Sequence, residues 1–344
     1  MTAREPGPVA SSPGEQPLEA PHRRGGARPR VIERLAVAGY RATARLLPLL
    51  PAGPSSEIIG RLSQLSYQLW PTKRRWSNRN FGYVLGLPPD HGAVRSLALR
   101  AYHGYGRYLV ELMRLPSMSS EELSRQVPAL DLDRVRDVWD DRPDRPGLIL
   151  TVAHMGHLEM VAASIAEHGM PISVVADDSS FPELFELLRR QREGWGVTII
   201  PWRNLREIFA VLRRREILGL VVDWGYRSDG IPVRLFGAWT ALPAGPALLA
   251  ARSGSRILPI AIRRRPDGIF HVSWSEPIEV ASAEPAELQR VTQRIADALE
   301  ANVGTAPEQW YSFKPIWPAT TAEAVDLERR AGLMQAGIAD PGPA

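Results

Sequence analysis

The feature that most constrains the fold of this chain is an alternation that begins at residue 147. From there, short apolar runs of strand length alternate with amphipathic segments of helical length. The apolar runs cover residues 148–153, 172–176, 197–200, 217–222, 257–262 and 269–274, and the amphipathic segments cover about 157–168, 181–192, 203–216, 243–253 and 284–302. This alternation predicts an α/β fold with a mostly parallel central sheet flanked by helices. Functional groups are then expected at the carboxyl ends of the strands.

An N-terminal helical extension is predicted to precede the sheet. Apolar residues recur at helical spacing over residues 31–49, 55–70 and 92–115. The first segment carries Arg41 and Arg45 and is too short and too charged to cross a bilayer, which requires ~20 apolar residues. Its apolar face with flanking arginines suits a helix that lies in a membrane interface, and it equally suits a helix packed on the rest of the protein.

The composition along the chain predicts its organisation. Residues 1–30 are rich in Pro, Gly, Ser and Ala and end in a basic run, which predicts a disordered basic tail. Residues 31–330 are interpreted as a single domain. Within it, a helical region covers 31–120 and an α/β core covers 147–318. Residues 331–344 are expected to form a flexible C-terminus.

The overall composition excludes several classes of protein. The 344 residues contain no cysteine, which excludes disulfide frameworks, thiol nucleophiles and Cys-ligated zinc. Apolar residues make up 44% and charged residues 23%, as in a globular protein. Neither a GxGxxG fingerprint after a strand nor a GxxxxGK[ST] loop is present. The N-terminus lacks the apolar core of a secretory signal, so a cytosolic chain is expected.

The positive charge of the chain is carried almost entirely by arginine. Lys and Arg number 42 against 38 for Asp and Glu, a net charge of +4, and Lys73 and Lys314 are the two lysines. Because guanidinium groups bind phosphates and carboxylates through two parallel hydrogen bonds, anionic partners are allowed. The basic residues are dispersed among acidic ones instead of forming one module interleaved with aromatic residues. Nucleic acid is therefore not expected as a partner.

His154 is the residue at which the pattern most strongly indicates chemistry. The apolar run 148–153 leads directly into His154, and a glycine and a helical pattern follow. A histidine just before a first helical turn can face a carboxylate in that turn, here Glu159. Such a pair forms a general base, because the carboxylate fixes the tautomer while the other ring nitrogen accepts a proton from a hydroxyl. Amides at the start of the helix could hold developing negative charge.

Simpler interpretations of these residues stay open. The helix dipole favours an acid such as Glu159 in a first turn, and His157 suits a helix surface. The spacing His154-x-x-His157-x-Glu159 could also bind a metal. A glycine turn separates the two histidines, however, and no third or fourth ligand cluster is evident, so no metal is predicted.

Polar and aromatic residues near later strand ends are further candidates. Asp223 follows the apolar run 217–222, and because a buried unpaired charge is costly, we expect it to pair with an arginine such as Arg227. Pro243 and Pro246 suit a first helical turn. Tryptophans also gather around these loops, where they form either a lipid-facing rim or core packing. They are Trp195, Trp202, Trp224 and Trp239.

Several blocks of this sequence resemble a known family. His154-x4-Glu159 after a strand resembles the H-x4-D/E motif of the lysophospholipid acyltransferase superfamily, and later blocks are similar to its lipid A/lauroyl acyltransferase-type branch. In order, these blocks are REGWG (192–196), LVVD (220–223), DGIPVRLFG (229–237), LPAGPALLA (242–250) and PEQWY (307–311). The resemblance covers residues 35–318. Within the branch, the chain looks most like actinobacterial phosphatidylinositol mannoside acyltransferases. It departs from them at Glu159, where they tend to have Asp, and at Pro232, where an acidic residue is expected.

The resemblance implies acyl transfer from a thioester, either acyl-CoA or acyl carrier protein, to a hydroxyl of a phospholipid or glycolipid such as phosphatidylinositol mannoside. His154 would deprotonate the acceptor, and Glu159 would orient and charge-stabilise the ring. Arg192 would steady the thioester oxygen or an anionic group of a substrate, or is simply a surface residue. No covalent enzyme intermediate, metal or cofactor besides the acyl donor is implied. The residues expected to bind substrate are Arg192, Asp223, Arg227, Phe236, Gly237, Pro243 and Gly245.

The implied reaction also predicts a location. Because acyl chains reach such an enzyme at a membrane, we expect a peripheral protein on the cytoplasmic face of the cell membrane. The first helical segment, 31–49, and the basic tail would then form the docking face.

Two other functions are compatible with parts of the pattern. An α/β serine hydrolase would need a G-x-S-x-G elbow, which Arg252-Ser253-Gly254-Ser255 does not supply. A lipid-binding protein that has lost catalysis remains an alternative if Pro232 marks a decayed site.

Overall fold

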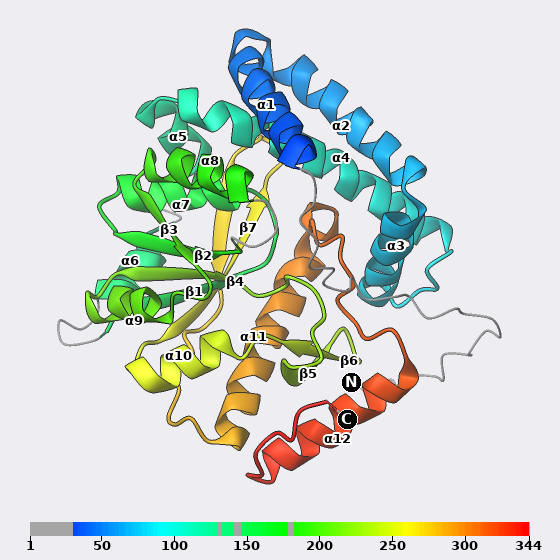
Figure 1. Cartoon of the computed structure of the whole chain (residues 1–344), viewed down its shortest axis with the longest axis vertical. Coiled ribbons are helices and arrows are strands. Elements are labelled where there is room, and N and C mark those ends of the chain that lie inside the picture. The colour runs from blue at the N-terminus through cyan, green and yellow to red at the C-terminus, as the bar shows by residue number, and fades with distance from the viewer. Residues whose placement is uncertain (1–29, 129–131, 141–145, 178–181, 344) are drawn as a thin grey trace.

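The computed structural model describes residues 30–128, 132–140, 146–177 and 182–343. Within these ranges, the α/β fold with a mostly parallel central sheet is confirmed (Figure 1). The sheet order is β3-β2-β4-β1-β7-β8, and every neighbouring pair is parallel except β7 and β8. The strands are β1 (Leu148–Val152), β2 (Ile172–Ala176), β3 (Val197–Pro201), β4 (Ile217–Val221), β7 (Ile257–Arg264) and β8 (Phe270–Trp274). Each lies on an apolar run predicted from the sequence.

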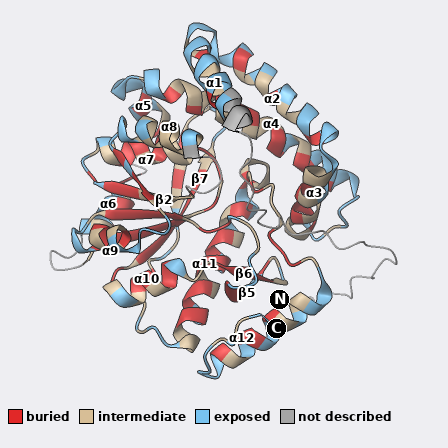
Figure 2. Cartoon of the chain, in the orientation of Figure 1, coloured by how far each residue is buried: buried red, intermediate tan, exposed pale blue. Residues whose placement is uncertain are grey.

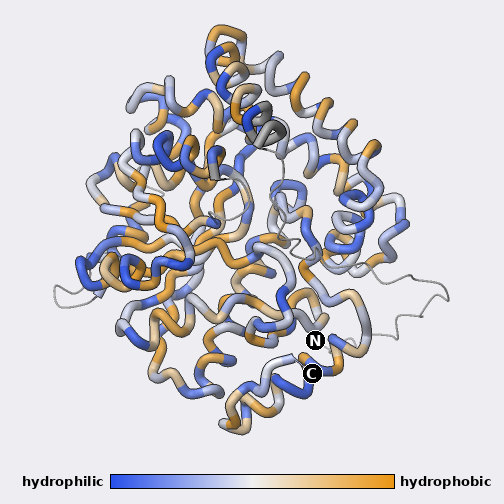
Figure 3. The backbone as a smooth tube through the Cα atoms, viewed as in Figure 1, coloured by the Kyte–Doolittle hydropathy of each residue, from blue (hydrophilic) through white to orange (hydrophobic). Residues whose placement is uncertain are grey.

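Helices cover both faces of this sheet, because its strands are apolar on both sides. In β1, Ile149 packs into one apolar cluster, while Leu148 and Leu150 pack into the other. Buried residues and apolar residues accordingly concentrate in the strands between the helices (Figures 2 and 3). On the Ile149 face lie α9 (Leu205–Arg213), α10 (Gly245–Ser253) and α11 (Pro285–Thr305); on the opposite face lie α5 (Ser120–Gln126), α6 (Asp133–Asp140) and α7 (Leu158–Glu167).

A separate antiparallel hairpin, β5 (Ile231–Leu235) and β6 (Ala238–Leu242), was not predicted. Its strands are short, and the first carries a proline, which weakens the strand signal. Phe236 and Gly237 form the two-residue turn, with φ angles of 49° and 75°. Two successive positive φ values fit a turn whose twist matches that of a hairpin.

The N-terminal helical region contains α1 (Arg30–Leu46), α2 (Ala52–Leu69), α3 (Pro71–Leu85) and α4 (Gly92–Arg114). The predicted segments correspond to α1, α2 and α4, whereas α3 was missed because its sequence, PTKRRWSNRNFGYVL, is largely polar. Helix α1 packs on α8 (Pro182–Glu193), where the Tyr40 hydroxyl donates to Gln191 Oε1 at 2.8 Å. The described part of α1 therefore matches the interpretation of a helix packed on the protein. Residues 1–29 of the predicted tail lie outside the described residues.

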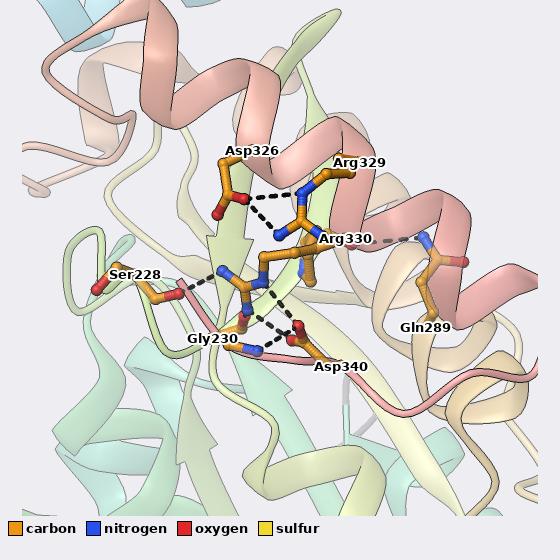
Figure 4. Close-up of polar contacts among 9 residues, drawn as sticks. Ser228, Gly230, Gln289, Asp326, Arg329, Arg330 and Asp340 are labelled. Atoms are coloured by element: carbon orange, nitrogen blue, oxygen red, sulfur yellow. Dashed lines mark hydrogen bonds and ion pairs between the residues drawn. The ribbon is translucent and has the colours of Figure 1, made fainter. Parts of the chain in front are cut away.

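Part of the C-terminus that we expected to be flexible, residues 331–335, belongs to a helix in the structure. Helix α12 (Thr321–Gln335) packs on β5 and β6, and Arg330 within it is only 1% exposed. The Arg330 guanidinium binds Asp340 at 2.6 and 2.7 Å and donates to the carbonyl oxygens of Ser228 and Gly230 (Figure 4). Local sequence patterns do not reveal that a C-terminal acid satisfies a buried arginine.

Candidate active site

Two neighbouring parallel strands bring His154 and Asp223 together. Val152 of β1 lies opposite Val221 of β4, and the Val222 amide donates to the Val152 carbonyl at 3.0 Å. His154 follows β1 and Asp223 follows β4, so both residues lie at the carboxyl edge of the sheet. This is the edge at which open α/β sheets bind ligands.

The carboxylate of Asp223 holds the ring of His154. Asp223 Oδ1 lies 2.8 Å from His154 Nδ1 and accepts from the His154 amide at 3.0 Å. The other oxygen, Oδ2, accepts from Trp310 Nε1 at 2.6 Å. The side chain of Asp223 is fully buried, whereas that of His154 is 30% exposed. A contact at Nδ1 leaves Nε2 as the ring nitrogen available to a substrate.

The pair shifts the proton affinity of both members. Burial opposes charge on the His154 ring, but the charge and hydrogen bond of Asp223 outweigh it and raise the pKa of His154 above 6.5. Burial likewise opposes charge on Asp223, but the nearby imidazolium and the hydrogen bonds from His154 and Trp310 lower its pKa below 3.8. The pair therefore favours an ionised Asp223 and a His154 ring that holds a proton more readily than a free imidazole.

A segment near the C-terminal end of the core fixes the backbone that carries His154. The Tyr311 amide donates to the His154 carbonyl at 2.7 Å, and the Gly156 amide donates to the Gln309 carbonyl at 3.2 Å. Gly156 has a φ of 64°, and a Cβ built there would lie 2.2 Å from the Ile262 carbonyl oxygen. Only glycine fits this close turn, which bends the chain from β1 into α7.

Glu159, the predicted partner of His154, has other hydrogen-bond partners in the structure. Its Oε1 accepts from Arg192 Nη2 and its Oε2 accepts from the Tyr108 hydroxyl, both at 2.8 Å. Burial opposes its charge, but Arg192, His157 and Tyr108 lower the pKa of Glu159 below 4.5. Its charge still favours protonation of His154 through space. The contact that orients the ring is thus made by Asp223, and Glu159 is held by α4 and α8.

His157 is a buried helix cap instead of the expected surface residue. Its Nδ1 accepts from the Met160 amide at 3.1 Å, and the side chain has no exposed surface. Burial lowers the pKa of His157 to about 4, so the ring is neutral at physiological pH. The two histidines have different partners, and no cluster of three potential metal ligands occurs among the residues that the structure describes.

The predicted pairing of Asp223 with Arg227 is wrong. Arg227 binds the carboxylate of Asp229, at 2.8 and 2.5 Å, and both of these side chains are more than half exposed. The side chain of Asp223 is buried, and its carboxylate is satisfied by His154 and Trp310. Asp229, two residues away on the same exposed loop, is more accessible to Arg227 than the buried Asp223 is.

The remaining predicted substrate-binding residues lie in or near turns. Phe236 and Gly237 form the β5–β6 turn, where the Phe236 amide donates to Glu300 Oε2 at 2.5 Å. Gly245 begins α10, and Pro243 lies just before its N-cap. Their roles in binding substrate stay predictions. Pro232, the departure from the family pattern, is buried in β5, and its carbonyl accepts from Gln289.

The tryptophans divide between rim and core. Trp224 is 46% exposed, and its ring centroid lies 5.7 Å from that of His154; Trp202 is 40% exposed. Trp195 instead packs against an apolar cluster, and Trp239 lies under the guanidinium of Arg234. Of these four tryptophans, Trp224 is the one whose ring packs beside His154.

Comparison with known proteins places the chain in a family. The model of the family described as bacterial lipid A biosynthesis acyltransferase matches residues 30–318, which include every residue of the site described above. The chain belongs to this family. The resemblance stated from the sequence is confirmed, and the protein is an acyltransferase of lipid biosynthesis.

Individual relatives of known function support the same assignment. Phosphatidylinositol mannoside acyltransferase of Mycolicibacterium smegmatis is 28% identical over 301 residues, which cover 86% of this chain and 94% of the relative. The enzyme of the same name from Mycobacterium tuberculosis (strain CDC 1551 / Oshkosh) is 29% identical over 265 residues, or 74% and 79% of the two chains. Lipid A biosynthesis lauroyltransferase of Escherichia coli is 22% identical over 226 residues, or 63% and 70%.

Some contributors to the site were missed by sequence reasoning. Trp310 lies in the PEQWY block, which marked family likeness but gave no sign that the indole contacts Asp223. Tyr108 is one aromatic residue in a helical pattern, and its contact with Glu159 joins residues 51 positions apart. Nothing in local spacing indicates either contact.

Proposed function

We propose that the protein transfers a fatty acyl group from a thioester to a lipid hydroxyl, with His154 as general base and Asp223 as the group that orients it. The observation that carries the proposal is the contact between His154 Nδ1 and Asp223 at 2.8 Å on a ring that is 30% exposed. The buried carboxylate fixes the proton on Nδ1. The other nitrogen, Nε2, then accepts a proton from a substrate hydroxyl.

The reaction balances without a covalent enzyme intermediate. His154 Nε2 takes the proton of the acceptor hydroxyl as the oxygen attacks the thioester carbon. The tetrahedral oxyanion collapses, the carbon–sulfur bond breaks, and the imidazolium returns the proton to the departing thiolate. Asp223 stabilises the imidazolium between these steps. Glu159 and Arg192, which form an ion pair, stay our candidates for the groups that set the electrostatic potential near the thioester.

The relatives suggest the substrates. We propose a glycolipid acceptor related to phosphatidylinositol mannoside, because relatives bearing that name match over most of this chain. The donor is acyl-CoA or acyl carrier protein, and both present the same thioester to His154. The His154–Asp223 pair is intact, which favours an active enzyme over a lipid-binding homologue without catalysis.

The test of this proposal is acyl transfer with a matched pair of histidine variants. Radiolabelled palmitoyl-CoA or palmitoyl-acyl carrier protein is incubated with phosphatidylinositol mannoside, and the acylated lipid is quantified. We expect His154→Ala to lose about 10²- to 10⁴-fold in rate, because the general base is removed. His168→Ala is the control, since His168 caps the far end of α7 and contacts Ser164.

The outcomes of this assay separate the alternatives. Loss of transfer in His154→Ala with normal rates in His168→Ala supports the proposal. Equal rates in the two variants would contradict it. Absence of transfer from either donor in the native chain would favour lipid binding without catalysis.

We further propose that the protein docks on a lipid bilayer through an apolar stripe on α2. We define the α2 stripe as Ile58, Leu62, Leu65 and Leu69, which recur at helical spacing and are 50–73% exposed. Leu46, Leu49, Leu50 and Trp70 extend the exposed apolar surface at its ends. A continuous exposed apolar surface made of this many large side chains is costly in water and is typical of an interaction site.

Charge complementarity favours a lipid surface as the occupant of the α2 stripe. Arg61 lies on the same helix and is paired with Glu57, and Arg41, Arg45 and Arg75 are exposed near the ends of the stripe. Apolar residues flanked by arginines suit a helix that lies in the interface of an anionic membrane. No helix in the part of the chain that the structure describes is long and apolar enough to cross a bilayer. The proposed docking face thus adds the α2 stripe to the segment 31–49 that we expected, whose Leu46 and Leu49 are exposed at its end.

A further inference from the structure

One short segment, residues 309–312, contacts both members of the His154–Asp223 pair. The Tyr311 amide donates to the His154 carbonyl at 2.7 Å, and the Ser312 hydroxyl donates to the Asp223 carbonyl at 3.2 Å. His154 follows β1 and Asp223 follows β4, so the segment joins the backbones of two residues that belong to different strands. It is therefore placed to set how the two side chains face one another.

The side chain of Trp310 in this segment reaches the carboxylate itself. Its Nε1 donates to Asp223 Oδ2 at 2.6 Å, while Asp223 Oδ1 lies 2.8 Å from His154 Nδ1. The His154 amide donates to both oxygens, at 3.0 Å to Oδ1 and at 3.1 Å to Oδ2. Because that amide is shared, the indole is the donor that distinguishes Oδ2 from Oδ1 among the residues that the structure describes.

The ring of Trp310 is held by its own packing. It is fully buried, and its centroid lies 6.0 Å from that of Phe81 and 6.5 Å from that of Trp317, with the ring planes nearly perpendicular in both contacts. The preceding residue, Gln309, exchanges two hydrogen bonds with the backbone of Arg264, at 2.6 and 2.9 Å. An enclosed ring on a fixed backbone directs its N–H one way, towards the carboxylate.

An uncharged donor is suited to this position. Burial raises the pKa of Asp223, but the charge of His154 and the hydrogen bonds from His154 and Trp310 lower it below 3.8. An indole N–H can only donate, so it stabilises the carboxylate without competing for a proton. A cationic donor at the same place would also repel the imidazolium that forms during the reaction.

We propose that Trp310 is a positioning residue, which holds the Asp223 carboxylate in the orientation that keeps a proton on His154 Nδ1 and leaves Nε2 free for the acceptor hydroxyl. The inference rests on the proposed function, because Trp310 is buried and acts through Asp223 and His154. A neutral imidazole in water favours the opposite tautomer, with its proton on Nε2. Without the indole donor the carboxylate can turn away, and the ring reverts towards that tautomer.

Nitrogen NMR of the histidine rings tests this role without turnover. The full-length protein is isotope-labelled at its histidines, the His154 resonances are assigned by their absence in His154→Ala, and the tautomer is measured at a pH where the ring is neutral. Trp310→Phe removes the N–H donor. Trp317→Phe is the matched control, because this buried indole packs against Trp310 but donates to the Leu235 carbonyl, at 3.2 Å.

The outcomes separate the inference from the proposed function. We expect the proton on His154 Nδ1 in the native protein and in Trp317→Phe, and a large share of the Nε2-protonated ring in Trp310→Phe. A native ring with its proton on Nδ1 and no change in Trp310→Phe would overturn the role of Trp310 alone, as would an equal change in both variants. A native ring with its proton on Nε2 would contradict the proposed function as well.

Kinetics with an isosteric side chain separate the hydrogen bond from packing, and they serve where Trp310→Phe fails to fold. Benzothienylalanine at position 310 has the shape of tryptophan with sulfur in place of the indole N–H. We expect kcat for acyl transfer to fall about 10- to 100-fold, as for a lost hydrogen bond to a charged group, with KM little changed. A native kcat in this protein would overturn the positioning role.

Discussion

At the scale of single residues, hydrogen-bond partners decide how each polar group of the site behaves. His154 and His157 are three positions apart, yet the pKa of His154 is raised and the pKa of His157 is lowered. The difference follows from their contacts, because Nδ1 of His154 faces a carboxylate while Nδ1 of His157 accepts from an amide. The helix cap in which His157 Nδ1 accepts a hydrogen bond is lost when the ring is protonated, because Nδ1 then carries a proton itself.

His157 therefore predicts a pH dependence of stability. Its pKa is about 4 in the folded state and near 6.5 when unfolded, so the unfolded chain binds the extra proton between these values. The stabilisation is complete above pH 6.5 and is lost as the pH falls towards 4, by about 3 kcal/mol in total. In His157→Asn, which keeps an acceptor for the Met160 amide, urea unfolding from pH 7 to 4.5 should show a shallower decline. Identical declines in both proteins would exclude this role.

The sequence placed His154 at the carboxyl end of a strand, as the structure shows, because an apolar run ending in a histidine is a local pattern. Its partner could not be identified in the same way. Asp223 was expected at the functional edge, but which group would pair with it depends on how β1 and β4 lie side by side. Glu159 was closer in sequence, yet the turn at Gly156 carries it towards Tyr108 and Arg192.

At the scale of elements, the strands of the sheet were predictable because each is an unbroken apolar run buried on both faces. The elements that were missed lack such a signal. Helix α3 is polar because it contributes contacts such as those of Asn80 with the 312–318 segment, and β5 contains Pro232 and an exposed Arg234. Their places depend on tertiary contacts that no local periodicity shows.

Helix α2 supplies the prediction that belongs to this scale. Replacing Leu62, Leu65 and Leu69 together by glutamine removes the apolar stripe without touching the site, so we expect a loss of binding to anionic liposomes in sedimentation. Transfer to a soluble, short-chain acceptor should persist. The matched control replaces Val325 and Ile338, which are exposed apolar residues on or near α12. Undiminished liposome binding by the α2 variant would remove the docking role.

At the scale of the whole molecule, α1 and α2 lie at one end and α12 at the other, with the sheet between them (Figure 1). The family match ends at residue 318, before α12, yet Arg330 reaches back to the carbonyls of Ser228 and Gly230. Those residues belong to the loop that begins after Asp223. Helix α12 thus holds the loop that follows Asp223 in place through these hydrogen bonds. The composition of the chain end gave no sign of this contact.

The whole account depends on His154 acting as a base that Asp223 controls, and the pH dependence of kcat/KM for acyl transfer measures this most directly. A base must be neutral, so the native rate should fall as the pH drops below an apparent pKa that lies above 6.5. In Asp223→Asn, that pKa should move down and the limiting rate should fall about 10²- to 10⁴-fold, because the ring loses both its charge partner and its fixed tautomer. An unchanged midpoint and an unchanged rate in Asp223→Asn would contradict the account.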